Sequence, residues 1–444
     1  MKLGDHILAQ YIDDRRKDGV FRVRRAIYTD PEIFEREMEL IFHACWIYLC
    51  HESQLSNHGD FLTTTIGTHP VFVIRGSDGT LGAYFNACPH RGNQLISRKS
   101  GNTQMIACKY HGWCFSADGR CTLVRGAEDG YDAKSLARIE TNLRAIGKLA
   151  IYKGFVFGSI SNDVPELEDF LGDARPFIDL IADQSPQGME VLRGESRYVI
   201  NANWKLQTDN STDGYHVASL HRNFATALAF RGSIADIPDD ALDKTESSRI
   251  LDLTSIESGG YDIGNGHMVN WSDRGSPAAA PLSRSREALL RRHSEAKVRW
   301  MIERGHIVTI FPNVLFNDVA STCIRVWRPV AVNRTEADTW CISPVGEDSE
   351  ARRARIRKYE DFFLPTSLAV PDDTRAMEGT HRGSQANGDE WNDLSLGAST
   401  AIDGPDAPAD AIGVVPQVSN PGRESETSMH GFYREWARRM EPVP

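Results

Sequence analysis

The spacing of apolar residues changes twice along the chain, and each change predicts a different kind of structure. Residues 31–42 place apolar side chains at helical spacing after Asp30, a predicted N-cap, and the first 43 residues as a whole favour helix. From residue 46 to residue 160, short apolar runs alternate with turn residues, which predicts a small all-β domain. Its clearest strands are residues 61–66, 71–74, 83–85 and 154–157, and Asp118-Gly119 predicts a hairpin.

After residue 161 the pattern becomes mixed, which predicts an α+β domain. The strand-like runs are residues 198–200, 306–311 and 323–327, and the helical runs are residues 285–304, 350–363 and 430–440. Residues 258–282 and 379–423 are irregular, and we expect long loops there. No internal repeat is visible, so the organisation is a β domain followed by an α+β domain.

Composition excludes several classes of function. Of 444 residues, 41% are hydrophobic and 25% are charged, a balance typical of soluble globular proteins. The net charge of −11 argues against nucleic acid and against an anionic membrane surface, because both attract basic proteins. The longest apolar run, residues 44–50, is far shorter than the roughly 20 residues that span a bilayer, and no apolar signal core begins the chain. We therefore expect a cytoplasmic protein.

The cysteines divide into two groups. Cys45, Cys50, Cys323 and Cys341 lie in apolar, strand-like stretches and are predicted to be small buried hydrophobic residues. The other four are crowded together: Cys88, Cys108, Cys114 and Cys121. We expect Cys114 and Cys121 to be core or hairpin residues, which leaves Cys88 and Cys108 as candidates for chemistry.

Each of these two cysteines is followed closely by a histidine. Cys88 precedes His90, and Cys108 precedes His111, so two short loops each offer a thiolate and an imidazole. Such a set binds either one Zn²⁺ or a Rieske [2Fe–2S] cluster, in which one iron takes both thiolates and the other both imidazoles. The mixed Cys/His order favours the cluster over the Cys-x2-Cys knuckles of zinc ribbons. A glycine follows each loop and lets backbone N–H groups approach bridging sulfides.

A second set of candidate ligands lies in the α+β domain. Asp213, His216 and His221 form the pattern D-x2-H-x4-H, and on a helix the first two share a face. Because residues five apart are separated by about 140° on an ideal helix, the helix must end or distort for both histidines to reach one metal. Two histidines that are simply satisfied in the core remain the alternative.

A carboxylate would complete a facial triad for non-haem Fe(II), which leaves coordination positions open. Asp372 and Asp373 follow Pro371 and are predicted to begin a helix, where the helix dipole favours carboxylates. Capping of that helix is the alternative role for both.

Together these motifs, in this order, resemble the large (α) subunit of Rieske non-haem iron aromatic-ring-hydroxylating dioxygenases. The resemblance covers nearly the whole chain and is closest to the benzoate/toluate/anthranilate 1,2-dioxygenase group. Besides the two Cys/His loops it is carried by the stretches 45–54, 183–194, 203–221, 311–314, 324–326 and 371–373. It implies a helical segment (1–43) packing on the catalytic domain, a Rieske domain (44–160) and a catalytic domain (161–444) with a Bet v1/START-like antiparallel sheet.

The resemblance also assigns roles to residues. Cys88, His90, Cys108 and His111 match the cluster ligands; His216, His221 and Asp373 match the mononuclear iron ligands. Asp213 matches the aspartate that links the iron site to a neighbouring subunit's Rieske histidine, here His111. Two positions depart from the family pattern: Asp209, where many relatives carry Asn, and Arg222, where benzoate-type relatives have a large aromatic residue.

The implied function is that of a terminal oxygenase. With O₂ and electrons ultimately from NADH, it would cis-dihydroxylate a benzoate-like carboxylate in aromatic catabolism; a Rieske monooxygenase, either a salicylate-type hydroxylase or a demethylase, has the same metal sites. An electron-transfer Rieske protein would leave the second domain unused, and a zinc-stabilised binding module would leave the second histidine pair unexplained.

The implied partners are other proteins. Residues 264–269 lack the third glycine of a dinucleotide fingerprint, so NADH oxidation falls to a separate flavin/iron–sulfur reductase, with or without a ferredoxin. A small β subunit would give an α3β3 assembly.

A substrate carboxylate needs a cation, and three arginines are candidates for it. They are Arg222, Arg325 and Arg328, each of which has an ordinary solvated arginine as its alternative. Arg325 and Arg328 point to opposite faces of a strand, so at most one faces inward. We expect the loop at 258–282 to cover the pocket.

Overall fold

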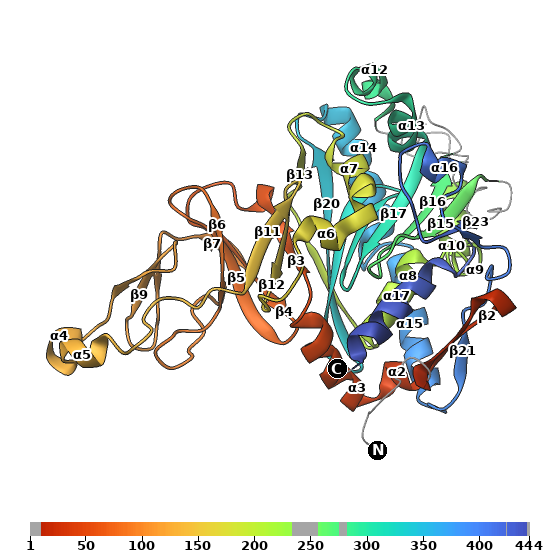
Figure 1. Ribbon diagram of the computed structural model, residues 1–444. Coiled ribbons are helices and arrows are strands. Elements are labelled where there is room, and N and C mark those ends of the chain that lie inside the picture. The colour runs from red at the N-terminus through yellow and green to blue at the C-terminus, as the bar shows by residue number, and fades with distance from the viewer. Residues whose placement is uncertain (1–9, 233–255, 275–281, 423, 442–444) are drawn as a thin grey trace. The chain divides into compact units, whose positions relative to one another are not determined.

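The computed structural model describes residues 10–232, 256–274, 282–422 and 424–441 (Figure 1). The chain divides into two compact units. The smaller unit is Phe42–Leu167, and the larger unit combines Met1–Ile41 with Glu168–Pro444. Within the described residues, no helix has both the length and the apolar character needed to cross a membrane.

The smaller unit is built from three antiparallel sheets, as predicted from its short apolar runs separated by turn residues. Their strands are β3 (Ile47–His51), β11 (Lys148–Tyr152) and β12 (Phe155–Ser159); β4 (Asp60–Ile66), β5 (His69–Arg75), β6 (Leu81–Phe85) and β7 (Ser100–Asn102); and β8 (Met105–Ala107), β9 (Cys114–Ser116) and β10 (Cys121–Leu123). Two short helices follow, α4 (Ala127–Gly130) and α5 (Ala133–Leu136). The predicted hairpin is confirmed: β9 pairs with β10, and Gly119 turns the chain with a φ of 78°.

A ten-stranded antiparallel sheet forms the core of the larger unit. Its order is β13 (Met189–Val191), β20 (Arg334–Pro344), β19 (Thr322–Ala331), β18 (Val314–Asp318), β17 (Arg304–Ile310), β16 (Met268–Asp273), β15 (Ser258–Asp262), β23 (Val418–Pro421) and β22 (Ile402–Asp403), with β14 (Ser196–Ile200) also on β20. With its helices this sheet gives the predicted α+β fold.

Helices cover both faces of this sheet. One face carries α8 (Trp204–Thr212), α14 (Ser349–Phe363) and α17 (Ser428–Met440), with α15 (Val370–Ser384) against α8 (Figure 1). The other face carries α7 (Arg175–Ala182) and α13 (Glu295–Glu303), whose Phe177 and Trp300 pack against Tyr261 and Trp271 of the sheet. The other α-helices in the described part of the chain are α2 (Ala26–Thr29), α3 (Pro31–Glu37), α6 (Leu167–Leu171), α9 (Val217–Leu220), α10 (Arg222–Gly232), α12 (Arg286–Leu290) and α16 (Ala407–Asp410).

The all-helical prediction for the first 43 residues is wrong in part. The helix after Asp30 is confirmed, since the Asp30 carboxylate accepts a hydrogen bond from the Glu32 N–H at 2.8 Å. Before it, however, β1 (Ile12–Arg15) and β2 (Val20–Arg24) form a hairpin, which β21 (Trp391–Asp393) extends. The alternation that buries every second residue of β2 was too short to be distinguished from a helical pattern.

The two irregular stretches are also more ordered than expected. Residues 258–273 form the β15–β16 hairpin, whose turn uses Gly264 and Gly266 at positive φ; residues 275–281 lie outside the described part. The stretch from 379 contains the end of α15, α16 and the strands β21, β22 and β23. The predicted helix 285–304 is two helices, because Ser294 caps a new start at α13.

A buried ion pair fixes the beginning of α8. Lys205 donates to the Glu37 carboxylate, and both side chains are fully buried. The indole N–H groups of Trp204 and Trp436 also donate to Glu37, each at 2.7 Å. Segments from the beginning, middle and end of the chain are therefore joined at one carboxylate.

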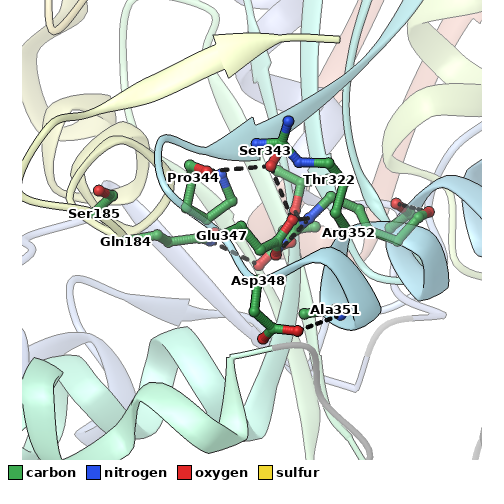
Figure 2. A network of polar contacts seen from close by, with 12 residues as sticks. Gln184, Ser185, Thr322, Ser343, Pro344, Glu347, Asp348, Ala351 and Arg352 are labelled. Carbon is green, nitrogen blue, oxygen red and sulfur yellow. Dashed lines mark hydrogen bonds and ion pairs between the residues drawn. The ribbon is translucent and has the colours of Figure 1, made fainter.

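A second polar network fixes the beginning of α14 against the sheet. The Ser343 hydroxyl donates to Glu347 at 2.8 Å, and Asp348 caps the helix by accepting from the Ala351 N–H at 3.0 Å (Figure 2). Arg355, almost fully buried, also donates to Glu347 at 3.0 Å. At the other end of α14, Phe362 and Phe363 line the cavity described next.

Candidate metal centres and active-site cavity

The two Cys/His loops of the smaller unit have the same backbone geometry. In the first loop, the Cys88 N–H donates to the Asn93 carbonyl and the Gly92 N–H donates to the Cys88 carbonyl, both at 2.8 Å. The second loop, residues 108–113, repeats both bonds at the corresponding positions, at 2.8 and 2.9 Å. The glycine of each loop has a positive φ, of 72° and 74°, which explains why both loops need one there.

The loops bring like ligands together. The Cys88 and Cys108 side chains are nearly buried and interact with each other. The His90 and His111 rings lie 4.6 Å apart between centroids, and the His90 ring is stacked on Trp113 at 4.9 Å. Thiol beside thiol and imidazole beside imidazole is the arrangement that a Rieske cluster needs.

The same four side chains do not converge on one ion. Among the residues that the structure describes, three ligand atoms come within 4.8 Å of one another only at His216, His221 and Asp373. A zinc site would instead place all four loop ligands around a single centre. The geometry therefore fits a binuclear cluster.

The protein environment acts differently on the two thiols. At Cys108 burial raises the pKa, but N–H groups of Tyr110 and His111 aimed at the sulfur outweigh burial and lower the pKa below its usual value. The Asn93 amide also contacts this sulfur at 3.7 Å. Burial keeps the pKa of Cys88 above its usual value.

In the larger unit, the backbone breaks at both histidines. Helix α8 ends at Thr212, and the single-turn helix α9 lies between His216 and His221. This confirms that the helix ends or distorts, and Asp213 reaches His216 from a turn rather than along one helix face. Asp213 instead folds a turn: its carboxylate accepts from the Tyr215 N–H at 2.6 Å and lies 3.2 Å from His216 Nδ1.

Asp373 closes the second candidate centre. It lies in the first turn of α15, and one of its carboxylate oxygens is 3.2 Å from His221 Nε2 and 3.5 Å from His216 Nε2. Asn210 donates to the same oxygen at 3.1 Å. The capping alternative is wrong, since no side chain caps this helix, and Asp372 is not part of the group.

The electrostatics of this group favour a bound cation. Burial raises the pKa of Asp373, but the hydrogen bond and charge of His221, together with His216 and Arg325, outweigh burial and hold the pKa below its ordinary value. Two imidazoles and one ionised carboxylate are the donor set of a facial iron triad, and their spacing fits one ion.

A cavity with about 770 Å³ of empty space, its open mouth included, opens beside the three side chains. Its floor is the sheet: Asn270, Ile307 and Asn317 are paired neighbours on three strands, and Leu315 and Arg325 are paired beside them. Helical residues form much of the remaining wall, among them Asn210, Ser211, Val217, Phe224, Phe362 and Phe363. The cavity therefore combines polar groups beside the candidate metal ligands with apolar side chains on its wall.

The three candidate arginines have different surroundings. Arg325 is buried in the cavity wall, whereas Arg328 on the opposite face of β19 is ion-paired with Asp338 at 2.5 Å. Arg222 is exposed at the start of α10 and does not line the cavity. The prediction that at most one of Arg325 and Arg328 faces inward is confirmed. The loop expected to cover the cavity contributes Asn270 to the floor, from strand β16.

Comparison with known families identifies both units. A model described as "Ring hydroxylating alpha subunit (catalytic domain)" matches residues 189–442, more than half of the chain, and a Rieske [2Fe-2S] domain model matches residues 45–139. The chain belongs to the ring-hydroxylating alpha-subunit family. Rieske domains carry a [2Fe–2S] cluster, and the catalytic domain of this family carries mononuclear iron.

Several curated relatives are similar over almost their whole length. This alpha subunit is 38% identical over 99% of its length to the alpha subunit of toluate 1,2-dioxygenase from Pseudomonas putida, covering 95% of that protein. It is 39% identical over 93% of its length to the anthranilate 1,2-dioxygenase large subunit of Acinetobacter baylyi, and the match covers 88% of that subunit. Among solved structures, naphthalene 1,2-dioxygenase with indole in its active site matches with a TM-score of 0.80 at 26% identity, over 96% of this chain and 93% of that one.

Some site residues of the alpha subunit were not foreseen. Asn210 lies in the motif-bearing stretch, and its position six residues before His216 was the available signal. The Phe362-Phe363 pair ends a correctly predicted helix, but nothing in the sequence shows which face of that helix meets the cavity.

Proposed function

We propose that His216, His221 and Asp373 hold a mononuclear Fe(II), and that the two Cys/His loops hold the [2Fe–2S] cluster through Cys88, His90, Cys108 and His111. The convergence of three ligand atoms within 4.8 Å beside a cavity supports the first site and is the observation that carries the proposal. The matched turns and the like-with-like pairing of side chains support the second.

We propose that this chain is the large subunit of a terminal oxygenase that cis-dihydroxylates a benzoate-like aromatic carboxylate. Relatives at 36 to 39% identity are named toluate, anthranilate and 2-halobenzoate 1,2-dioxygenases, which supports this substrate class. When bound, the two metal centres supply stored electrons and the activation of O₂. The residues of the chain bind and orient the metal ligands and the substrate and exclude water.

Binding and orientation fall to groups on the cavity wall. Asp213 holds the His216 ring by its Nδ1 side, which leaves Nε2 directed at the metal position. Asn210 donates to Asp373 and so fixes the orientation of that carboxylate. Apolar side chains on both the sheet and the helices exclude water from around an aromatic ring.

We propose that Asp213 also bridges to the partner subunit's His111 and so connects the cluster of one subunit to the iron site of the next. The Asp213 carboxylate is partly exposed, at 23%, while contacting His216, so it can accept a second hydrogen bond from an incoming imidazole. Tyr215 beside it and Tyr110 beside His111 are exposed aromatic residues, at 56% and 57%, which are common in interfaces. Sedimentation that finds a fully active monomer would refute this step.

We propose the same set of partners that the sequence implies. These are a small β subunit in an α3β3 assembly and a separate flavin/iron–sulfur reductase that oxidises NADH, with or without a ferredoxin, all in the cytoplasm. We place the Rieske domain at 44–160 and the catalytic domain at 161–444, with 1–43 packing on it; the limits of the two compact units, at 41/42 and 167/168, support these assignments.

The experiment that tests the proposal is product analysis under ¹⁸O₂. Holoenzyme with a reductase should convert benzoate to a cis-dihydrodiol that contains two labelled oxygens. One labelled oxygen in a phenol would instead identify a monooxygenase of the salicylate-hydroxylase or demethylase type, and unlabelled product would exclude oxygenation altogether.

A further inference from the structure

Arg325 is an unusual residue for the wall of a cavity. It lies in β19, is only 4% exposed, and lines the cavity beside the proposed iron ligands. Its Nε and Nη2 atoms are buried without any hydrogen-bond partner. Across the described part of the chain, no carboxylate lies within 4.0 Å of its guanidinium, whereas the buried Arg328 and Arg355 both have one.

Burial of an unpaired charge is costly, so this arrangement calls for an explanation. Buried charges in proteins are normally paired, because an uncompensated buried charge destabilises the fold. A metal ion would be bound by the two imidazoles in their neutral form, and the Asp373 carboxylate faces these imidazoles rather than pairing with Arg325. The guanidinium therefore retains the capacity to bind an anion from the cavity.

The neighbours of Arg325 indicate what kind of anion fits. Leu315 is its cross-strand partner, and the Phe363 ring lies 5.9 Å from the guanidinium carbon. Ile307 and Phe362 line the same space. A ligand with one anionic end and one flat apolar body matches this wall.

We propose that Arg325 binds the carboxylate of the aromatic substrate and thereby sets its specificity for an acid over a neutral ring. This inference rests on the proposed function and deepens it, because it names the residue that selects the substrate class. The planar guanidinium can donate two parallel hydrogen bonds to a carboxylate. Arg325 and the triad line the same cavity, so a ring anchored by its carboxylate would share that cavity with the proposed iron site.

The test compares two probes of similar size, benzoate and benzamide, in equilibrium binding to anaerobic holoenzyme by calorimetry. Arg325→Gln and Arg325→Met remove the charge. Because a charged hydrogen bond is lost, benzoate affinity should fall on the order of 30-fold, while benzamide affinity should change less than about threefold. Arg222→Gln, which removes an exposed arginine outside the cavity, is the matched control and should leave both affinities unchanged.

The Tm of the ligand-free variants distinguishes a binding role for Arg325 from a purely structural role, because loss of a structural residue would lower the Tm. In the absence of ligand, Arg325→Met removes an unpaired buried charge, so its Tm should equal or exceed that of the wild type. If a neutral variant fails to retain its metals, Arg325→Lys carries the test, with a loss of about tenfold for benzoate because the forked contact is lost.

The outcomes separate the inference from the proposed function. Equal losses for both probes, no loss for either, or a selective loss in Arg222→Gln would overturn the role of Arg325. If benzoate binds through Arg325 but is not oxygenated, the proposed reaction fails and the inference stands. If Arg325→Gln oxygenates benzoate with an unchanged KM, the inference fails and the reaction stands.

Discussion

Replacing Asp213 with asparagine separates its charge from its role in the local turn. The asparagine carbonyl can still accept from the Tyr215 N–H, so the chain reversal before His216 should survive. Only the negative charge facing His216 Nδ1 at 3.2 Å is lost. Asp213→Ala removes the turn contacts as well.

The magnitude follows from this contact. Groups that orient a metal-bound histidine contribute about 10- to 100-fold to activity or metal affinity. We expect Asp213→Asn to retain its iron and to turn over about 10- to 100-fold more slowly, because the His216 ring is less well oriented and the proposed bridge loses its charge. Asp213→Ala should in addition retain less iron.

The assay is single-turnover reoxidation of the reduced cluster in the presence of substrate and O₂, followed by its absorbance, together with iron analysis. Asp372→Asn is the matched control, since this neighbouring carboxylate is not part of the metal-ligating group. It should react within about twofold of the wild type. Wild-type reoxidation and turnover in Asp213→Asn would refute the role assigned to Asp213.

Three further predictions concern stability and cavity shape. Glu37→Gln leaves Lys205 buried without its anion and should destabilise the protein by about 3 to 5 kcal/mol, measured as a lower Tm than that of Glu39→Gln on the exposed surface. Burial raises the pKa of Asp209 to about 6, so the folded protein loses stability as pH rises from about 4 to about 6 and this carboxyl group ionises. Asp209→Asn should remove this pH dependence and be more stable than the wild type by up to about 3 kcal/mol above pH 6. A pH profile of Tm identical to that of the wild type would contradict this prediction. Phe363→Ala should cost about 3 to 5 kcal/mol while admitting larger aromatic acids, which competition binding would detect; unchanged size selectivity would remove Phe363 from the cavity wall.

The sequence is most informative where the chemistry demands particular residues at fixed spacing. The Cys/His loops, the pair His216 and His221, and the carboxylate after Pro371 could each be recognised because few other arrangements of those residue types bind metal. Short strands with regular turns also identified the β domain, since alternation is a local property.

The features that could not be predicted from the sequence are those that depend on tertiary contacts. The β15–β16 hairpin has a glycine-rich sequence that resembles a loop, and it is a pair of strands because its neighbours in the sheet supply hydrogen bonds. The burial of Arg325 could not be predicted from its position in the sequence either. Arg325 lies in a cavity wall because β18 pairs with β19 and α14 packs against the sheet.

We propose that one chain carries two separate metal centres with different ligands. Iron and acid-labile sulfide analysis of anaerobically prepared Asp373→Ala and of the wild type tests it most directly. Asp373→Ala should lose the one mononuclear iron and all turnover while keeping the two cluster irons, the sulfide and the Rieske spectrum. Full iron content with intact turnover in Asp373→Ala, or wild-type protein without acid-labile sulfide, would contradict it.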